Sequence, residues 1–113
     1  MSWEIANTKE WGDWFDGLSV ELQDAIAARL ELLAERGPAL GRPTVDTLTG
    51  SELPNLKELR VDADGQNTRT LFVFDPTRTA ILLMGGSKTG QWSKWYRTAI
   101  PQAERLYEEH LRE

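Results

Sequence analysis

The sequence predicts an α+β protein with a mostly antiparallel sheet. Two segments of helical periodicity lead the chain, three strand-like segments cluster in its middle, and a helical segment ends it. With a short strand at the N-terminus, the expected order is β, α, α, β, β, β, α, which gives a four-stranded sheet. The 113 residues are one domain's worth of chain, and we expect a single domain over residues 1–113.

The N-terminal part is predicted to form a short strand and a first helix. In residues 2–6, Trp3 and Ile5 fall on one face of an extended segment. From about Thr8 the apolar spacing becomes helical, and it breaks at Gly17. The apolar stripe of this helix consists of Trp11, Trp14, Phe15 and Leu18, and we expect the two tryptophans to lie in the core.

A second helix is expected from Val20 to Arg36. Ser19 is a suitable N-cap because its hydroxyl accepts from the free amides of a first turn. The pair Gly37-Pro38 ends the helix, since glycine accepts the left-handed conformation and proline cannot continue the pattern. The side chains expected to point inward are Leu22, Ile26, Leu30 and Leu33.

The rest of the chain is expected to supply three strands and one helix. Residues 38–54 are predicted to be irregular, and strands are predicted at 56–62, 68–75 and 79–84, followed by a glycine-rich loop. We expect a turn at 93–98 and a helix only from about Ala99, because Pro101 belongs in a first turn. Four side chains of this helix would face the sheet, namely Ala103, Leu106, Tyr107 and Leu111.

The turn between the first two of these strands predicts an unusual cross-strand pair. Asp64-Gly65 suits a type I′ hairpin turn, and centring the turn there places Arg60 directly opposite Arg69, off the core face. Like charges in that position destabilise a sheet. One interpretation is that Glu58, on the same face, neutralises both arginines. The other is that the pair is kept for an anion, because the planar guanidinium binds phosphate through two hydrogen bonds.

Composition excludes several classes of site. The chain has no cysteine, so disulfides, thiolate metal sites and cysteine nucleophiles are excluded, and a reducing cytoplasm suits it. The one histidine, His110, lies near the end on the polar side of a helix, which excludes a Ser-His-Asp triad. No carboxylate pair has a spacing that demands a metal, and we expect no cofactor. We see no signal peptide and no apolar run of the roughly 18 residues that a membrane helix needs.

The charge is unevenly distributed along the chain. The net charge is −5, which argues against nucleic-acid binding by general electrostatic attraction. Residues 37–100, however, hold eight bases and six acids, for +2, while both ends are acidic. This asymmetry is either the product of solvated helix faces or the sign of an anion site in the middle of the chain.

The segment GGSKTGQWSKWY adds two lysines and three aromatic residues beside the sheet. Lys88 follows the last strand, but the segment lacks the spacing of a P-loop. Trp92 and Trp95 can stack nucleobases or pack the last helix onto the sheet, and packing is the favoured reading. Tyr96 carries a hydroxyl that can move a proton. Residues alone therefore predict an α+β protein with a possible anion site.

Three strings in this order and spacing resemble the phage-derived branch of the HigB/RelE toxin superfamily. They are LGRPTVDTLTGSELPNLKELRV, TRTLFVFDPTRTAILLMGGSKTGQW and KWYRTAIPQAERLYEEHL. The resemblance covers nearly the whole chain. It implies a microbial-ribonuclease-like fold, in which two N-terminal helices pack on a twisted sheet and a C-terminal helix follows.

The resemblance also implies a function and site residues. Such toxins belong to type II toxin–antitoxin pairs and cut mRNA in the ribosomal A site by attack of the 2′-OH on the adjacent phosphate, without a metal. Arg60, Arg69 and Lys88 match basic positions of the family, and Tyr96 lies where some relatives keep a tyrosine. Catalytic roles would fall to these four residues and to Glu58, which stands where some relatives carry a base. RNA-binding roles would fall to Lys57, Trp92 and Trp95.

The expected partners are a helix-turn-helix antitoxin, the ribosome and mRNA, with DNA bound only through the antitoxin and no membrane. A non-catalytic family member that works as an interaction or autoregulation partner is the alternative function. A third class is an unrelated enzyme or binder of small anions.

Overall fold

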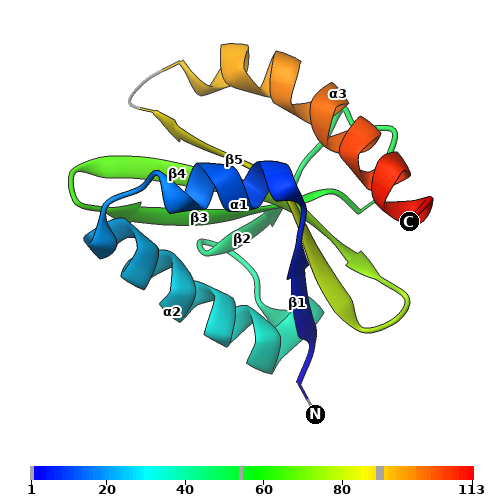
Figure 1. The fold of residues 1–113 in the computed structure, drawn as a ribbon, viewed down its shortest axis with the longest axis horizontal. Helices are drawn as coiled ribbons and strands as arrows, with labels where there is room; N and C mark the ends of the chain where they lie inside the picture. Colours follow the sequence, from blue (N-terminus) through cyan, green and yellow to red (C-terminus); the bar gives the residue numbers. More distant parts are fainter. Residues whose placement is uncertain (1, 54, 89–90) are drawn as a thin grey trace.

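The computed structural model describes residues 2–53, 55–88 and 91–113, and it contains a mixed five-stranded sheet between helices (Figure 1). The strand order is β1-β5-β4-β3-β2. The elements are β1 (Glu4–Asn7), α1 (Lys9–Asp16), α2 (Val20–Arg36), the 3-10 turn η1 (Gly37–Ala39), β2 (Val45–Thr47), β3 (Lys57–Ala63), β4 (Gln66–Asp75), β5 (Thr79–Lys88) and α3 (Trp92–Leu111).

The sheet has one strand more than the sequence predicted. Residues 45–47, expected to be irregular, form β2 and pair antiparallel with β3. This strand is only three residues long, so its sequence carries too little alternation to be recognised. β1 runs parallel to β5, and the other pairings are antiparallel. The α+β class is confirmed, and the four-stranded count is wrong.

The predicted hairpin register is confirmed. Arg60 pairs with Arg69 across β3 and β4. Asp64 and Gly65 have φ values of 52° and 70°, the positive pair that a type I′ turn requires. The hydroxyl of Ser19 donates to Asp64 Oδ2 at 2.8 Å, which ties this turn to the start of α2.

Helices α1 and α2 cover one face of the sheet with the main core. The predicted cap at Ser19 is present, since its side chain accepts from the amide of Leu22. The side chain of Thr8 caps α1 in the same way, by accepting from the amide of Trp11. Trp11 is buried, its indole N–H donates to Thr70 Oγ1 at 3.0 Å, and Trp14 packs against the same cluster. The prediction that both tryptophans belong to the core is therefore confirmed.

Helix α3 covers part of the opposite face (Figure 1). It begins at Trp92, so the expected turn at 93–98 and the expected start near Ala99 are wrong. Pro101 lies inside the helix, where the carbonyl that it leaves without a partner belongs to Arg97, an exposed residue that water reaches. Ala103 and Leu106 are buried and Tyr107 packs against them, as predicted. Leu111 is 59% exposed, so its expected contact with the sheet is wrong.

Strand β5 continues through residues that were expected to form a loop. Gly85 and Gly86 pair with Thr70 and Arg69 of β4. A Cβ on Gly85 would lie 2.2 Å from Trp14, and a Cβ on Gly86 would lie 2.6 Å from Trp95. The two glycines therefore serve close packing of an indole from each side of the strand, which is why the glycine-rich string is a strand here.

Candidate functional site

Two arginines lie side by side on the sheet face that α3 covers in part. Arg60 on β3 and Arg69 on β4 are direct cross-strand partners. Their side chains alternate with Leu59, Val61 and Thr70, which point into the layer beneath α1 and α2. The pleat of the hairpin thus places both guanidinium groups on the face that carries α3.

Glu58 is a buried counterion that this pair shares. It is only 1% exposed, and its Oε2 accepts from Nε and Nη2 of Arg60 at 2.9 and 2.7 Å. Its Oε1 lies 3.6 Å from Nε of Arg69. Asp46 on β2 adds a weaker contact, with Oδ2 3.4 Å from Nη2 of Arg60. These contacts are the ones required by the interpretation in which Glu58 pairs with both arginines, and they leave the anion interpretation open. The hydrogen bond with Glu58 raises the pKa of Arg60.

The two arginines differ in how fully their donors are used. The Arg60 side chain is 36% exposed and has a close pair of bonds to Glu58. The Arg69 side chain is 16% exposed, and its Nε is buried without a hydrogen-bond partner among the described residues. Its guanidinium lies over the Trp92 ring, 4.6 Å from the centroid. Arg69 is therefore held by stacking on Trp92, by a long hydrogen bond from Nη1 to the Thr68 carbonyl at 3.4 Å and by attraction to Glu58, and it makes no close hydrogen bond to a carboxylate.

Tyr96 connects α3 to this cluster. Its hydroxyl donates to Glu58 Oε1. Burial raises the pKa of Tyr96 above its ordinary value, the hydrogen bond with Glu58 raises it further, and Arg69 acts in the opposite direction. The phenol is consequently neutral at pH 7 and points its proton at the carboxylate.

The other residues proposed for RNA binding occupy different environments. Trp95 packs into the core cluster beneath α3 and against Gly86, so the packing interpretation is the one that its contacts support. Trp92 is half-buried between Arg69 and Trp95, with the two indoles edge to face at 5.1 Å. Lys57 donates to Thr47 Oγ1 at 2.7 Å, and the strand alternation directs it to the face opposite Arg60. The structure therefore does not bring Lys57 to the arginine pair.

Lys88 ends β5, where its backbone pairs with Asn67. Its side chain lies outside the described residues, so its predicted role stays a prediction.

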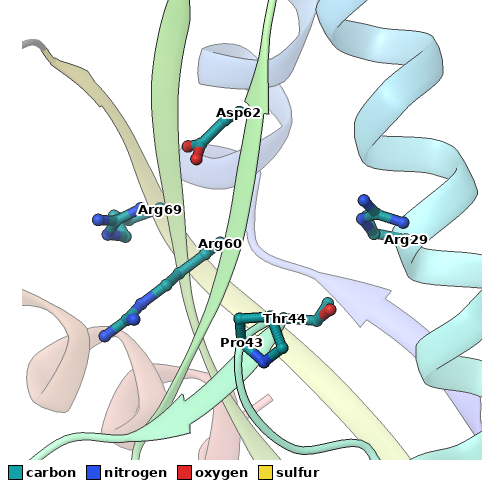
Figure 2. A pocket seen from close by; sticks show the side chains of 6 residues that line it. All are labelled: Arg29, Pro43, Thr44, Arg60, Asp62 and Arg69. Atoms are coloured by element: carbon teal, nitrogen blue, oxygen red, sulfur yellow. The ribbon is translucent and has the colours of Figure 1, made fainter.

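Two pockets meet at Arg60. One, of about 330 Å³, is lined by Arg29, Pro43, Thr44, Arg60, Asp62 and Arg69 (Figure 2). We call it the arginine pocket. The other, of about 270 Å³, includes Glu58, Arg60 and Tyr96 together with residues of β2, and we call it the tyrosine pocket. The arginine pair therefore lies between a pocket lined by three arginines and a pocket that contains the Tyr96 side chain.

Comparison with known families decides the relationship of this chain. Residues 13–108 match the family model described as "Phage derived protein Gp49-like (DUF891)". The chain belongs to this Gp49-like family. The resemblance to a phage-derived toxin branch is thereby confirmed at the level of the family.

Two proteins of Mycobacterium tuberculosis are similar to this Gp49-like chain. One, named "Putative toxin HigB2", is 44% identical over 107 residues, which are 94% of this chain and 53% of the relative. The other, named "Putative toxin HigB3", is 44% identical over 98 residues, which are 87% of this chain and 84% of the relative. The chain thus spans about half the length of the first relative and most of the second.

Sequence reasoning missed two residues of the candidate site, Asp46 and Arg29. Asp46 lies in a strand too short to be recognised, although Val45 and Thr47 on either side give it the expected alternation. Arg29 was overlooked because the packing of α2 against the edge of β3 is tertiary information. Within the described residues there is no group of three or more potential metal-ligating His, Cys, Asp and Glu side chains. No helix in that part of the chain is long and apolar enough to cross a membrane.

Proposed function

We propose that this protein is the toxin of a type II toxin–antitoxin pair, with a RelE-like microbial-ribonuclease fold, and that it cuts mRNA on the ribosome. The names of the two relatives support a toxin, and membership of the Gp49-like family agrees with them. The observation that carries the activity is the cross-strand pair of Arg60 and Arg69 beside the hydroxyl of Tyr96. We place its action in the cytoplasm, where ribosomes and mRNA are available.

The arginine pair suits the charge that develops during cleavage. Attack of a ribose 2′-OH on the adjacent phosphorus forms a pentavalent phosphorane with additional negative charge on its oxygens. Arg60 and Arg69 stabilise these oxygens, and one such donor contributes roughly 3 kcal/mol to the transition state. The bond to the 5′-oxygen then breaks, leaving a 2′,3′-cyclic phosphate and a 5′-hydroxyl that takes its proton from water. Lys88 holds a flanking phosphate in this scheme.

Tyr96 and Glu58 together provide a path for the 2′-OH proton. Tyr96 alone is a poor base, because its pKa is raised and the phenol keeps its proton at pH 7. If its proton passes to Glu58 Oε1 while its oxygen receives the proton of the 2′-OH, no free tyrosinate forms. Glu58 then has two tasks, to neutralise the arginines in the resting site and to accept the proton during cleavage.

The acidic balance of the chain explains why a ribosome would be required. A net charge of −5 provides little general attraction for RNA, and the site has no strong base. Ribosome binding would supply the local concentration and the orientation of the mRNA that this protein lacks.

The second candidate function is that of a non-catalytic family member bound to its antitoxin. The observation that favours it is the burial of Glu58 against both arginines, which offsets one of their two positive charges in the free protein. In both functions we propose a helix-turn-helix antitoxin as partner, with DNA bound only through it. An acidic or apolar antitoxin segment would shield the exposed part of Arg60.

One experiment separates the two functions. The protein is expressed without its partner, and the 5′ ends of cellular mRNA are mapped in wild type and in Arg69→Ala. New ends within coding regions that depend on Arg69 support the ribonuclease. Purified protein is then given the same mRNA bare and on a programmed ribosome. Cleavage of both at equal rates contradicts ribosome dependence, and no cleavage of either contradicts the nuclease.

A further inference from the structure

The arginine pocket reaches beyond the cross-strand pair to a third cation on another layer of the molecule. Its lining contains three arginines and one carboxylate, that of Asp62. Figure 2 shows Arg29 on α2, across β3 from Arg60 and Arg69. The pocket therefore passes around the edge of the sheet, from the face that carries α3 toward the layer of α2.

The sequence of α2 leaves Arg29 without a carboxylate. The helix is acidic, yet the positions three and four residues away from Arg29 are all apolar, namely Ala25, Ile26, Leu32 and Leu33. Arg29 is exposed, and in the described ranges it makes no ion pair within 4.0 Å. Its charge is thus available to a ligand, whereas that of Arg60 is shared with Glu58 and Asp46.

The edge of β3 leaves room for a chain to pass between these cations. β2 pairs with β3 only from Lys57 to Leu59, and the last backbone contact on this side joins the amide of Arg60 to the carbonyl of Thr44 at 2.8 Å. The next residue of β3 whose backbone groups point to this edge is Asp62, and it is exposed. A strand of RNA that leaves the arginine pair can therefore cross this open edge toward α2.

We infer that the arginine pocket binds a second phosphodiester of the RNA, next to the one to be cut, and that Arg29 is its binding residue. This inference rests on the proposed function and deepens it. A nucleic acid presents one charge per nucleotide at regular spacing, so a strand whose scissile phosphate lies at Arg60 and Arg69 must place a neighbouring phosphate nearby. Arg60 and Arg69 are held by Glu58, and Arg29 has no ion pair in the described ranges. This arrangement suits one reacting phosphate at the pair and one positioning contact at Arg29.

The chemistry favours RNA over an acidic peptide as the occupant. Arg60 belongs to both pockets, so the arginine pocket is continuous with the hollow where Tyr96 would meet a 2′-OH. Only a ligand that has phosphates on both sides of a ribose uses the arginine pair, Arg29 and the Tyr96 hydroxyl together. A peptide carboxylate would use one cation and leave the tyrosine pocket empty.

The test measures binding of short RNA analogues whose 2′-oxygens are methylated, so that they cannot be cut. A dinucleotide carries one phosphodiester and a tetranucleotide carries three, and a second tetranucleotide has its flanking phosphates replaced by neutral methylphosphonates. We expect Arg29→Ala to weaken binding of the charged tetranucleotide about fivefold and to lower the salt slope by about one. Binding of the dinucleotide and of the neutralised tetranucleotide should not change.

Arg36→Ala is the matched control, because Arg36 is also exposed on α2 and lines neither pocket. Equal losses of RNA affinity in both variants would show that the effect comes from net charge alone, and this result would overturn the inference. Weaker antitoxin binding with unchanged RNA binding in Arg29→Ala would assign the pocket to a protein and also overturn it. If wild type cleaves on the ribosome and Arg29→Ala binds the tetranucleotide normally, the subsite fails alone. If wild type cleaves no RNA on the ribosome, the proposed function fails with it.

Discussion

The two faces of the β3–β4 hairpin use the same pleat for opposite purposes. Toward α1 and α2, Leu59, Val61 and Phe72 are buried in one apolar cluster. The polar side chains on that face are satisfied, since Thr68 donates to the carbonyl of Val61 and Thr70 accepts from Trp11. This dry face therefore combines buried apolar side chains with threonines whose hydroxyl groups are hydrogen-bonded.

Toward α3, the same strands place three charged side chains between Tyr96 and Trp92. Glu58 is buried with them, Arg69 retains an unbonded Nε, and Arg60 borders two pockets. Such a cluster is poor evidence for stability, because burying charges costs solvation that their attraction rarely exceeds. On this face the apolar core lies further along β4, where Leu71 and Val73 are buried beneath α3. Around Arg60 and Arg69, the comparison indicates that the face toward α1 and α2 serves folding and that the face toward α3 carries the candidate chemistry.

Truncation on the dry face should have the largest effect of all on folding. Leu59→Ala removes a side chain with no exposed surface from the centre of the main core. We expect the free energy of unfolding to fall by about 3 kcal/mol, through lost burial and the cavity left behind. Chemical denaturation measures it. A loss below about 1 kcal/mol would show that this face does not dominate folding.

Arg69→Ala should produce the reverse pattern. Cleavage on the ribosome should fall at least about 100-fold, the usual loss for one transition-state donor. Unfolding should change by no more than about 1 kcal/mol, because Glu58 keeps its two bonds from Arg60 and the one from Tyr96. Arg69→Lys should also fail in cleavage, since lysine offers a point charge in place of a planar fork. A destabilised but fully active Arg69→Ala would contradict the phosphate clamp.

Glu58→Gln should affect both properties. Removing the charge leaves two cross-strand arginines with only the weak contact to Asp46, and we expect a loss of about 2 kcal/mol in stability. The double variant Glu58→Gln, Arg69→Ala should recover part of that loss, because the repulsion is gone. Thermal melting of the wild type and the three variants completes a double-mutant cycle. Strictly additive effects would mean that Glu58 is not the counterion of Arg69.

The smallest effect concerns alkaline pH. The pKa of Tyr96 is raised in the folded protein, so the folded state retains a proton that the unfolded chain releases near pH 10. Stability from this group is complete below that pH and is lost as the pH rises through the folded pKa. Tyr96→Phe should therefore show a shallower decline in melting temperature above about pH 10. Tyr107, whose pKa burial also raises, should keep part of the slope. Identical slopes would contradict the buried phenol.

Much of the fold was predictable because its determinants are local. The cap at Ser19 and the turn at Asp64-Gly65 are short-range signals that tertiary packing did not override. The start of α3 was not predictable, because the packing of Trp95 and Tyr96 onto the sheet compensates for Pro101 in the helix interior.

The site divides in the same way. The strand period and the turn sufficed to place Glu58, Arg60 and Arg69 together, since all three depend on one hairpin. The same alternation assigns Lys57 to the opposite face, and its role in RNA binding stays a prediction. Arg29 required knowledge of how α2 lies along β3, and a helical pattern does not contain that information.

The hydroxyl of Ser19 makes hydrogen bonds to two separate parts of the molecule. It accepts from the amide of Leu22 at the start of α2 and donates to Asp64 at the tip of the hairpin. The helix that bears Arg29 and the strands that bear the arginine pair are consequently joined at the same end, so we expect their thermal fluctuations to be correlated. Losing this one contact would broaden the spread of separations between Arg29 and Arg60 while leaving their average nearly unchanged.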